Sequence, residues 1–278
     1  MGRHELLDIP GLLVGFEEFL SVDLQRAERT VSGHVNMMRR FLEETRLDPR
    51  GTSRADLRSY LKRVQAQHPG RYKNQLSAFK VFFRDYLGTP GVVSTFRFPP
   101  KRDPLVNVVS RDNLKVFYHT LNQLRARAML LTYASSGLRA KELRDLRRKH
   151  VDPEKRMIIP QNTGSRTKRT YITFYNQEAA GLLHRILPRD PKARIFPVSE
   201  HYFRRRTRRA KQKTGVRITP QLLREWFCSE MGRLGVPDRY VDAFCGRVPK
   251  SVLAKHYTDY RPEKLQEIYE KADLKVLA

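Results

Sequence analysis

The stretch YASSGLRAKELRDL, residues 133–146, joins two segments that are both predicted to be helical. The first covers residues 124–138, and the second covers residues 139–151 and begins at an arginine. Glu142 and Asp145 lie three residues apart among basic side chains of the second segment, where ion pairing on a helix surface is their simplest role. The stretch therefore predicts two successive helices with a strongly charged junction.

The segments around this junction predict more helices and one β-hairpin. Residues 156–161 and 168–174 alternate around a turn at 162–166, which is typical of two antiparallel strands. Thr219 and Pro220 are typical of a helix N-terminus. The other helices predicted in this part of the chain span residues 110–121, 176–187 and 219–235, with a helical tail at 262–278.

The N-terminal part is predicted to be a separate helical domain. Three prolines among basic residues in FRFPPKRDP, residues 96–104, indicate an extended linker after it. We therefore expect a helical domain at residues 1–95, a linker at 96–104 and a second domain at 105–278. The fold class is mainly α with a small β-hairpin or sheet. The helices predicted in the first domain span residues 12–20, 30–45, 53–64 (with Ser53 as N-cap) and 71–88.

The net charge indicates a polyanionic partner. Lys and Arg outnumber Asp and Glu by 55 to 29, which gives a net charge of +26. Self-repulsion on that scale destabilises a compact chain unless a polyanion binds it, and nucleic acid is the leading partner. An anionic membrane is the alternative, but the sequence has no apolar run of membrane-spanning length, signal peptide or lipidation motif. We expect no membrane association and a location in the cytoplasm, at the nucleoid.

The basic run RRRTRRAKQK, residues 204–213, contains no acidic residue that could neutralise it. Contact with the phosphate backbone of double-stranded DNA is therefore favoured over a merely solvated helix face. Such contacts set affinity and salt dependence but carry little sequence information. The predicted DNA-binding residues are Arg204, Arg205, Arg206, Arg208, Arg209, Lys211 and Lys213.

Cys228 and Cys245 are the only cysteines, and they lack the CxxC spacing of a zinc site or a secreted disulfide framework. We expect two buried, reduced thiols. A disulfide is the alternative, because intracellular proteins of hyperthermophiles can carry one.

Arginine and tyrosine are the residues that the chain offers for catalysis. The sequence shows no compact carboxylate set for Mg²⁺ and no Walker A, GxGxxG or GxSxG motif, so we expect no metal and no cofactor. Arginines can hold the non-bridging oxygens of a phosphodiester as negative charge develops on them. The same positive charge favours the phenolate of a tyrosine, whose ordinary pKa is near 10. A covalent phosphotyrosine would keep the ester energy, so that the strand can be resealed without ATP.

Two stretches resemble the active-site boxes of the tyrosine recombinases, the phage integrase family. In the first box a Gly-Leu-Arg turn is followed three residues later by Glu, and Arg139 and Glu142 fall on those positions. Residues 218–260 resemble the second box, in which Arg224 takes the arginine position and Tyr257 that of the nucleophile. The resemblance implies that Glu142 supports an arginine; simple helix ion pairing is the alternative.

The second box departs from the family pattern at two positions. Gln221 stands where the family has its first histidine, and Arg247 follows Gly246 where a second histidine or a tryptophan is usual. Glutamine cannot act as a general base, so proton removal from Tyr257 is left to the positive field or to another group. Arg247 can still donate to a phosphate. Such histidine-poor boxes resemble those of archaeal viral and plasmid integrases of the fusellovirus type.

The remaining catalytic positions have alternatives. The family places a lysine on or near a β-turn between the boxes, where Lys168 stands, although many members have it a few residues earlier, near the positions of Ser165 and Arg166. A solvated strand lysine is the other interpretation of Lys168. Tyr260 is the rival of Tyr257 but is expected to anchor the following helix, and Tyr240 to pack in a helix core. His256 is left out of the catalytic set.

The resemblance implies a site-specific recombinase or integrase that acts through a 3′-phosphotyrosyl intermediate. Tyr257 would attack the scissile phosphate, and Lys168 would protonate the departing 5′ oxygen. The residues implied to hold the phosphate are Arg139, Arg224 and Arg247. Two alternatives remain: a catalytically silent DNA-binding protein of the same fold, and a type IB topoisomerase-like enzyme that relaxes DNA.

The family also implies an assembly. Its N-terminal domain clamps duplex DNA together with the catalytic domain, and four protomers act on two duplexes. Each C-terminal tail docks on a neighbouring protomer. The apolar residues that could make this contact here are Leu265, Ile268, Tyr269 and Leu274.

Overall fold

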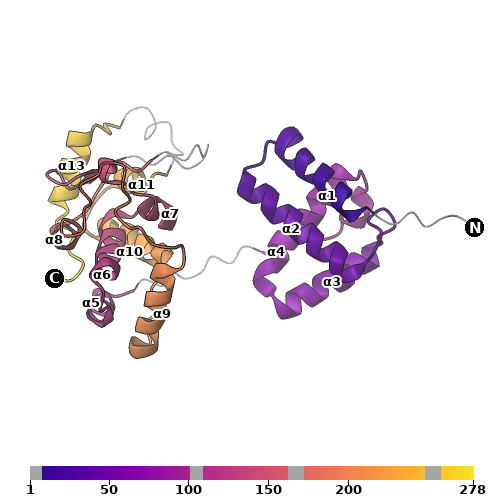
Figure 1. The fold of residues 1–278 in the computed structure, drawn as a ribbon, viewed down its shortest axis with the longest axis horizontal. Coiled ribbons are helices and arrows are strands. Elements are labelled where there is room, and N and C mark those ends of the chain that lie inside the picture. The colour runs from indigo at the N-terminus through magenta and orange to yellow at the C-terminus, as the bar shows by residue number, and fades with distance from the viewer. Residues whose placement is uncertain (1–7, 101–108, 162–171, 248–257) are drawn as a thin grey trace, which may run out of the picture. The chain divides into compact units, whose positions relative to one another are not determined.

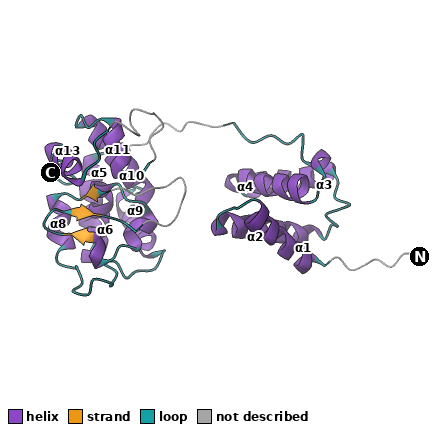
Figure 2. Cartoon of the chain, turned by 90° about the horizontal axis from the view of Figure 1, so that it is seen from above, coloured by secondary structure: helices purple, strands orange, loops and turns teal. Residues whose placement is uncertain are grey.

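The computed structural model describes residues 8–100, 109–161, 172–247 and 258–278. The chain divides into two compact units, residues 1–103 and 104–278 (Figure 1). Each unit has its own hydrophobic core. In the described part of the chain helices predominate and the strands are short (Figure 2). The prediction of a mainly α fold with a small sheet is confirmed.

The first unit is helical. Ser53 caps α3 as predicted, because its hydroxyl accepts the N–H of Asp56 while the Asp56 carboxylate accepts the N–H of Ser53. The predicted helix 71–88 is observed as α4 followed by a π-helical segment, and the chain then turns at Gly88 with a φ of 67°. The elements are α1 (Ile9–Glu18), η1 (Phe19–Asp23), α2 (Glu28–Thr45), α3 (Arg54–Gln67), α4 (Pro69–Phe79), η2 (Lys80–Tyr86) and η3 (Pro90–Val92).

The core of the first unit is rich in aromatic rings. The ring centres of Phe41 and Phe79 are 4.9 Å apart, as are those of Phe16 and Phe82, and both pairs have edge-to-face geometry. Such pairs add to the free energy of burial and have a defined geometry. These rings come from α1, α2, α4 and η2, so they hold the helices of this unit together.

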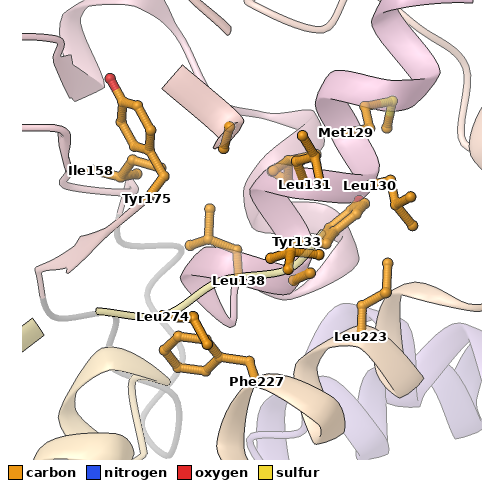
Figure 3. Close-up of a cluster of buried hydrophobic side chains, with 14 of the residues drawn as sticks. Met129, Leu130, Leu131, Tyr133, Leu138, Ile158, Tyr175, Leu223, Phe227 and Leu274 are labelled. Atoms are coloured by element: carbon orange, nitrogen blue, oxygen red, sulfur yellow. The ribbon is translucent and has the colours of Figure 1, made fainter. Parts of the chain in front are cut away.

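The second unit is built around α6 (Leu124–Ser136). Ala126 and every residue from Ala128 to Ser136 are buried, because α6 contacts α8, α9, α10 and β3. Figure 3 shows side chains of α6 and of Leu138 in one cluster with Phe227 and Leu223 of α10. The helices of this unit are α5 (Arg111–Thr120), α6, α7 (Ala140–Arg144), η4 (Arg148–His150), α8 (Gln177–Leu183), α9 (Tyr202–Thr214), α10 (Pro220–Arg233), α11 (Asp238–Phe244) and α13 (Pro262–Lys271).

A three-stranded antiparallel sheet lies in the second unit. Its order is β1 (Val151–Asp152), β2 (Met157–Ile158) and β3 (Thr173–Phe174). Val151 pairs with Ile158, and Met157 pairs with Phe174. The predicted pairing of the two hairpin segments is therefore present, and β1 is an addition. The predicted turn at 162–166 lies outside the described residues.

The helix predicted over residues 139–151 is present only in its first part. The helix α7 ends at Arg144, and the chain continues through η4 into β1. The N–H of Arg148 donates to the carbonyl of Ala193, and the N–H of Ile195 donates to the carbonyl of Leu146, at 3.0 Å each. These tertiary backbone bonds replace the helical pattern that local sequence favours.

The predicted tail helix is only partly helical. The helix α13 ends at Lys271, and residues 272–278 run on without helical structure. The Glu178 carboxylate accepts the N–H groups of Val276, Leu277 and Ala278 at 2.6, 2.8 and 3.1 Å. One side chain of α8 therefore supplies the acceptors for all three N–H groups, in place of the backbone carbonyls of a continued helix.

Candidate active site

The candidate site includes the junction between α6 and α7. Gly137 ends α6 with a φ of 64°, a conformation that glycine adopts without steric cost. This turn sends the chain directly to Arg139, the residue that caps α7. Glu142 accepts the backbone N–H of Arg139 at 2.7 Å and a guanidinium N–H of the same residue at 2.6 Å. The carboxylate therefore both starts the helix and orients the arginine.

Arg139 also contacts a distant part of the chain. Its Nη2 donates to the carbonyl oxygen of Gly246, 107 residues further on, at 3.1 Å. Gly246 has a φ of 57° and follows Cys245, the residue that ends α11. The end of α11 is thus joined to the start of α7.

Arg224 is the buried member of the site, with 5% of its surface exposed. Its Nη1 donates to the carbonyl of Gly137, and its Nη2 donates to the carbonyl of Cys245 at 2.6 Å. Burial lowers the pKa of this guanidinium from its ordinary value, and the positive charge of Arg139 acts in the same direction. One buried cation therefore bridges the end of α6 and the end of α11.

Arg247 lies directly after this turn. Its Nη1 donates to Asp242 Oδ1 at 2.9 Å, and its Nη2 lies 3.6 Å from the Sγ of Cys228. Burial acts to lower the pKa of Arg247, but the hydrogen bond to Asp242 and the negative charges of Cys228, Cys245 and Asp242 together outweigh it, and the net shift is upward. The guanidinium is held charged at the rim of the site.

All three predicted arginines meet at residues 245–247. Arg139 and Arg224 bind carbonyls of this turn, and Arg247 belongs to it. Bonds among the described residues use two of the five N–H donors of each guanidinium. The site therefore presents fixed positive charge with donors to spare, which suits a phosphate oxyanion.

Gln221, the fourth predicted member of this group, points elsewhere. It is exposed, and its Nε2 donates to Glu225 Oε1 at 2.9 Å. Among the described residues no hydrogen bond joins it to the three arginines. Lys168 and Tyr257 lie outside the described residues.

Tyr240 and Tyr260 have the packing that was predicted for them. Tyr240 is 8% exposed, and the half-buried ring of Tyr260 lies 6.2 Å from it at an interplanar angle of 75°. Tyr260 lies two residues before Pro262, the first residue of α13. Its ring is therefore held as an anchor at the start of that helix.

The two cysteines lie against each other inside the site. Their Sγ atoms are 3.3 Å apart, and both are free thiols. Cys245 is buried as predicted, but Cys228 is only half-buried, because it lies on the side of α10 that reaches Arg247. The hydrogen bond with Cys245 and the charge of Arg247 lower the pKa of Cys228 to about 7, although burial acts to raise it. The pKa of Cys245 is raised by the same hydrogen bond and by burial.

The predicted basic run forms α9. Phe203, Thr207 and Ala210 make its buried stripe, at the i, i+4, i+7 spacing of one helix face. Six of the seven basic residues are exposed, and Arg206 is half-buried with its guanidinium 5.4 Å from the Tyr202 ring centre. Within the described ranges none of the seven forms an ion pair. The helix therefore presents positive charge that no carboxylate of the described residues neutralises.

The apolar residues of the tail lie in the core of their own unit. Leu265, Tyr269 and Leu274 are buried there, and Ile268 is partly buried. The hydroxyl of Tyr269 donates to the carbonyl of Ser135 at 2.6 Å. In this single chain, the tail thus packs on the second unit, to which it belongs.

The sequence did not point to three parts of the site. Asp242 binds Arg247, and the carbonyls of Cys245 and Gly246 bind the other two arginines. Asp242 is five residues before Arg247, a spacing that matches no common helix pair. Every residue has a carbonyl, so only the glycine before Arg247 could have indicated the turn.

Replacing Gly137 by alanine is expected to destabilise the second unit by about 2–4 kcal/mol. A Cβ at this position would lie 2.5 Å from the Phe227 ring and 3.0 Å from the Sγ of Cys245, in a backbone conformation that alanine disfavours. Urea unfolding measures the change. Gly181→Ala in α8 is the control, because a Cβ there meets nothing within 4 Å, and no loss of stability is expected. Equal stability of the two variants would contradict the close packing at Gly137.

Comparison with known proteins gives the family. The model described as the phage integrase family matches residues 107–264, so this chain belongs to that family, the tyrosine recombinases, and is a site-specific recombinase by class. The resemblance seen in the two boxes is confirmed. None of the described helices has the length and apolar composition to span a membrane, and the described residues contain no group of three His, Cys, Asp or Glu side chains placed to bind a metal ion.

The relatives are distant but span the chain. The tyrosine recombinase XerA of Pyrococcus horikoshii is 24% identical over 98% of this chain and 96% of its own length. XerC of Leptospira interrogans is 22% identical over 92% and 91%. The archaeal XerA relatives agree with the predicted similarity to archaeal proteins.

Solved structures of integrases share the fold. Lambda integrase bound to DNA aligns with a TM-score of 0.67 at 15% identity, over 92% of this chain and 95% of that one. The Tn1549 transposon integrase in complex with circular intermediate DNA aligns with a TM-score of 0.63 at 15% identity, over 92% and 97%. At these identities the likeness concerns the fold alone.

Proposed function

We propose that this recombinase cleaves and rejoins double-stranded DNA through a 3′-phosphotyrosyl intermediate, without metal or ATP. The observation that supports this proposal is the meeting of Arg139, Arg224 and Arg247 at one turn, each with N–H donors that bonds among the described residues leave unused. Donors fixed before the reaction stabilise the charge that develops on the non-bridging oxygens at no further cost of reorganisation. Three fixed cations supply the charge stabilisation that a metal ion supplies in other nucleases.

Tyr257 is proposed as the nucleophile and Lys168 as the acid that protonates the departing 5′ oxygen. Tyr257 stands ten residues after Arg247, so the intervening chain is long enough to reach the arginines. Attack by the phenolate oxygen forms the O–P bond to the protein as the bond to the 5′ oxygen breaks. Attack by a 5′ hydroxyl on the phosphotyrosine then reverses the step and seals a strand.

DNA is the proposed partner, bound as a duplex by both units, with residues 1–95 clamping it, 96–104 as linker and 105–278 carrying the chemistry. The exposed positive charge of α9 supports phosphate contact in the second unit. A lambda integrase tetramer has been solved on a Holliday junction, and we propose a tetramer here as well. Action on such DNA would place the protein at the nucleoid.

Exchange of the tail between protomers is part of the same proposal. The tail must then leave the position in which its own unit now buries Leu265, Tyr269 and Leu274. Each such side chain contributes about 1.5–3 kcal/mol on burial, so exchange requires that a neighbour offer an equivalent surface. In a tetramer of identical chains the equivalent surface is available.

A catalytically silent DNA-binding protein is the second candidate. The position of Gln221 favours it, because this side chain faces Glu225 and cannot take a proton from a phenol. A topoisomerase-like enzyme would share the cleavage chemistry but would relax supercoiled DNA alone. Neither alternative accounts for all of the features, since the three arginines are intact and the relatives named above are recombinases.

The test is a duplex nicked beside the cleavage point, so that the cleaved end diffuses away and traps the intermediate. We expect a denaturant-resistant protein–DNA adduct in EDTA and without ATP, with mass spectrometry placing the nucleotide on Tyr257. The duplex must carry the target sequence, which is first identified from the DNA bound in cells. Absence of the adduct on that sequence would establish the silent binder. An adduct that forms only with added Mg²⁺ would refute the metal-free chemistry.

Neutralising two arginines of α9 is expected to weaken the salt dependence of DNA binding. Each phosphate contact contributes about 0.9 to the slope of log K against log salt, so Arg208→Gln with Arg209→Gln should reduce the slope by about 2. Fluorescence anisotropy at several salt concentrations measures it. Lys264→Gln is the control, because Glu267 already binds that lysine at 2.8 Å. An unchanged slope in the double variant would remove α9 from the DNA interface.

A further inference from the structure

We propose that Cys228 and Cys245 form a peroxide-sensitive dithiol site, and that their oxidation to an intramolecular disulfide lowers the cleavage activity of the arginine site. The two residues are 17 positions apart in the sequence, on α10 and at the end of α11. Their Sγ atoms lie 3.3 Å apart, in contact but not bonded. The dithiol site is thus assembled by the packing of α10 on α11.

The surroundings of Cys228 favour reaction with an oxidant. Its thiol is half-buried rather than enclosed, so a small molecule can reach it. The Nη2 of Arg247 lies 3.6 Å from its Sγ, and a neighbouring cation favours the thiolate that reacts with peroxide. The pKa of Cys228 is lowered to about 7, first by the hydrogen bond with Cys245 and then by the charge of Arg247. Cys245 is 1% exposed, so its thiol reacts only with its neighbour.

The reaction is balanced with one molecule of hydrogen peroxide. The Cys228 thiolate attacks one peroxide oxygen, the O–O bond breaks, and the departing hydroxide takes a proton to become water. The Cys245 sulfur then attacks the sulfur of the Cys228 sulfenic acid, and the second oxygen leaves as water with the Cys245 proton. Two thiols lose two electrons to the peroxide, and a dithiol reductant such as dithiothreitol reverses the reaction.

The disulfide acts on the site through the backbone of its second cysteine. An S–S bond is about 2.05 Å long, so the two sulfur atoms must approach by about 1.2 Å from their present 3.3 Å. The carbonyl of Cys245 holds Arg224, and that of the next residue, Gly246, holds Arg139. A shift of this turn therefore displaces two guanidinium groups together.

Close packing limits how far side-chain rotation alone can absorb the approach. A single added carbon at Gly137 would already lie 3.0 Å from the Sγ of Cys245 and 2.5 Å from Phe227. Interiors packed at this density transmit a displacement to the backbone. Misplacement of catalytic groups by about 1 Å can cost up to about 100-fold in rate, so we expect oxidation to reduce cleavage by about 10- to 100-fold.

The first part of the test needs no DNA. Reduced, desalted full-length protein is titrated with hydrogen peroxide, quenched with catalase, and denatured with a maleimide mass tag that counts free thiols. The expected result is loss of both thiols together in a monomeric protein, with a peptide linked through Cys228 and Cys245. Oxidation of Cys228 alone, or a disulfide between two molecules, would overturn the dithiol site.

The second part measures adduct formation, and it rests on the proposed function. Each protein is compared with its own reduced form: the wild type should lose about 10- to 100-fold on oxidation and recover with dithiothreitol, whereas Cys228→Ser should be insensitive to peroxide. A disulfide that leaves cleavage unchanged would overturn the effect on activity. If reduced protein forms no adduct, the proposed function fails, while the thiol count still decides whether the dithiol site exists.

Discussion

Replacing Tyr257 by phenylalanine is expected to abolish the covalent protein–DNA adduct, a loss of at least about 10⁴-fold. The change removes one oxygen atom and no charge, so DNA binding should stay within a few-fold of the wild type. The physical reason is that the arginine site, in the proposed mechanism, would stabilise charge on the phosphate but would contribute no nucleophile of its own. Trapping on the nicked duplex measures the adduct, and fluorescence anisotropy measures binding.

Tyr260→Phe is the matched control. It removes the same oxygen three residues further on, from a ring that packs against Tyr240 at the start of α13. We expect the adduct to form at nearly the wild-type rate. If Tyr260→Phe loses the adduct and Tyr257→Phe keeps it, the nucleophile is Tyr260 and the assignment proposed above is wrong.

Local signals in the sequence predicted where several helices begin. The hydroxyls of Ser53 and Thr219 cap α3 and α10 as expected, because capping depends on residues within one turn of each other. The helix predicted over residues 139–151 extends too far, because the interactions that end it are not local. Its backbone bonds with residues 191–195 are tertiary, and no local pattern reports them.

The same distinction applies to the site. The resemblance of the two boxes to the family pattern predicted Arg139 and Arg224 as site residues, and the glycine before Arg247 predicted the third. Backbone carbonyls of Gly137, Cys245 and Gly246 accept hydrogen bonds from Arg139 and Arg224. Glu142 also binds Arg139, and Asp242 binds Arg247. A backbone carbonyl that acts as an acceptor cannot be recognised from composition or residue spacing, because every residue has one.

The contact between the two cysteines could not be predicted from the sequence either. It arises only when α10 packs on α11, which brings Cys228 and Cys245 together across 17 residues. A separation of that length matches neither a CxxC motif nor a helical repeat. Cys228 is half-buried because it lies beside Arg247, and this contact between residues 19 positions apart is tertiary too.

Arg224→Lys is expected to reduce cleavage by about 10²- to 10³-fold and to destabilise the second unit by about 2–4 kcal/mol. Arg224 donates through two nitrogens to carbonyls at the ends of α6 and α11. A lysine has one nitrogen on a flexible stem and cannot bridge both acceptors, so one buried carbonyl loses its partner. With 5% exposure at this position, burial would also lower the pKa of the new ammonium and weaken its charge.

Two measurements separate the loss of stability from the loss of cleavage activity. Urea unfolding gives the stability, and adduct formation at a temperature where the variant stays folded gives the chemistry. Arg233→Lys is the control on the same helix, because Arg233 is exposed and pairs with Glu230 at 2.6 Å, and both readings should change by less than about 0.5 kcal/mol or two-fold. A folded Arg224→Lys variant that cleaves like the wild type would show that this guanidinium holds the turn at 245–247 without touching the phosphate. The phosphate would then be held by Arg139 and Arg247 alone.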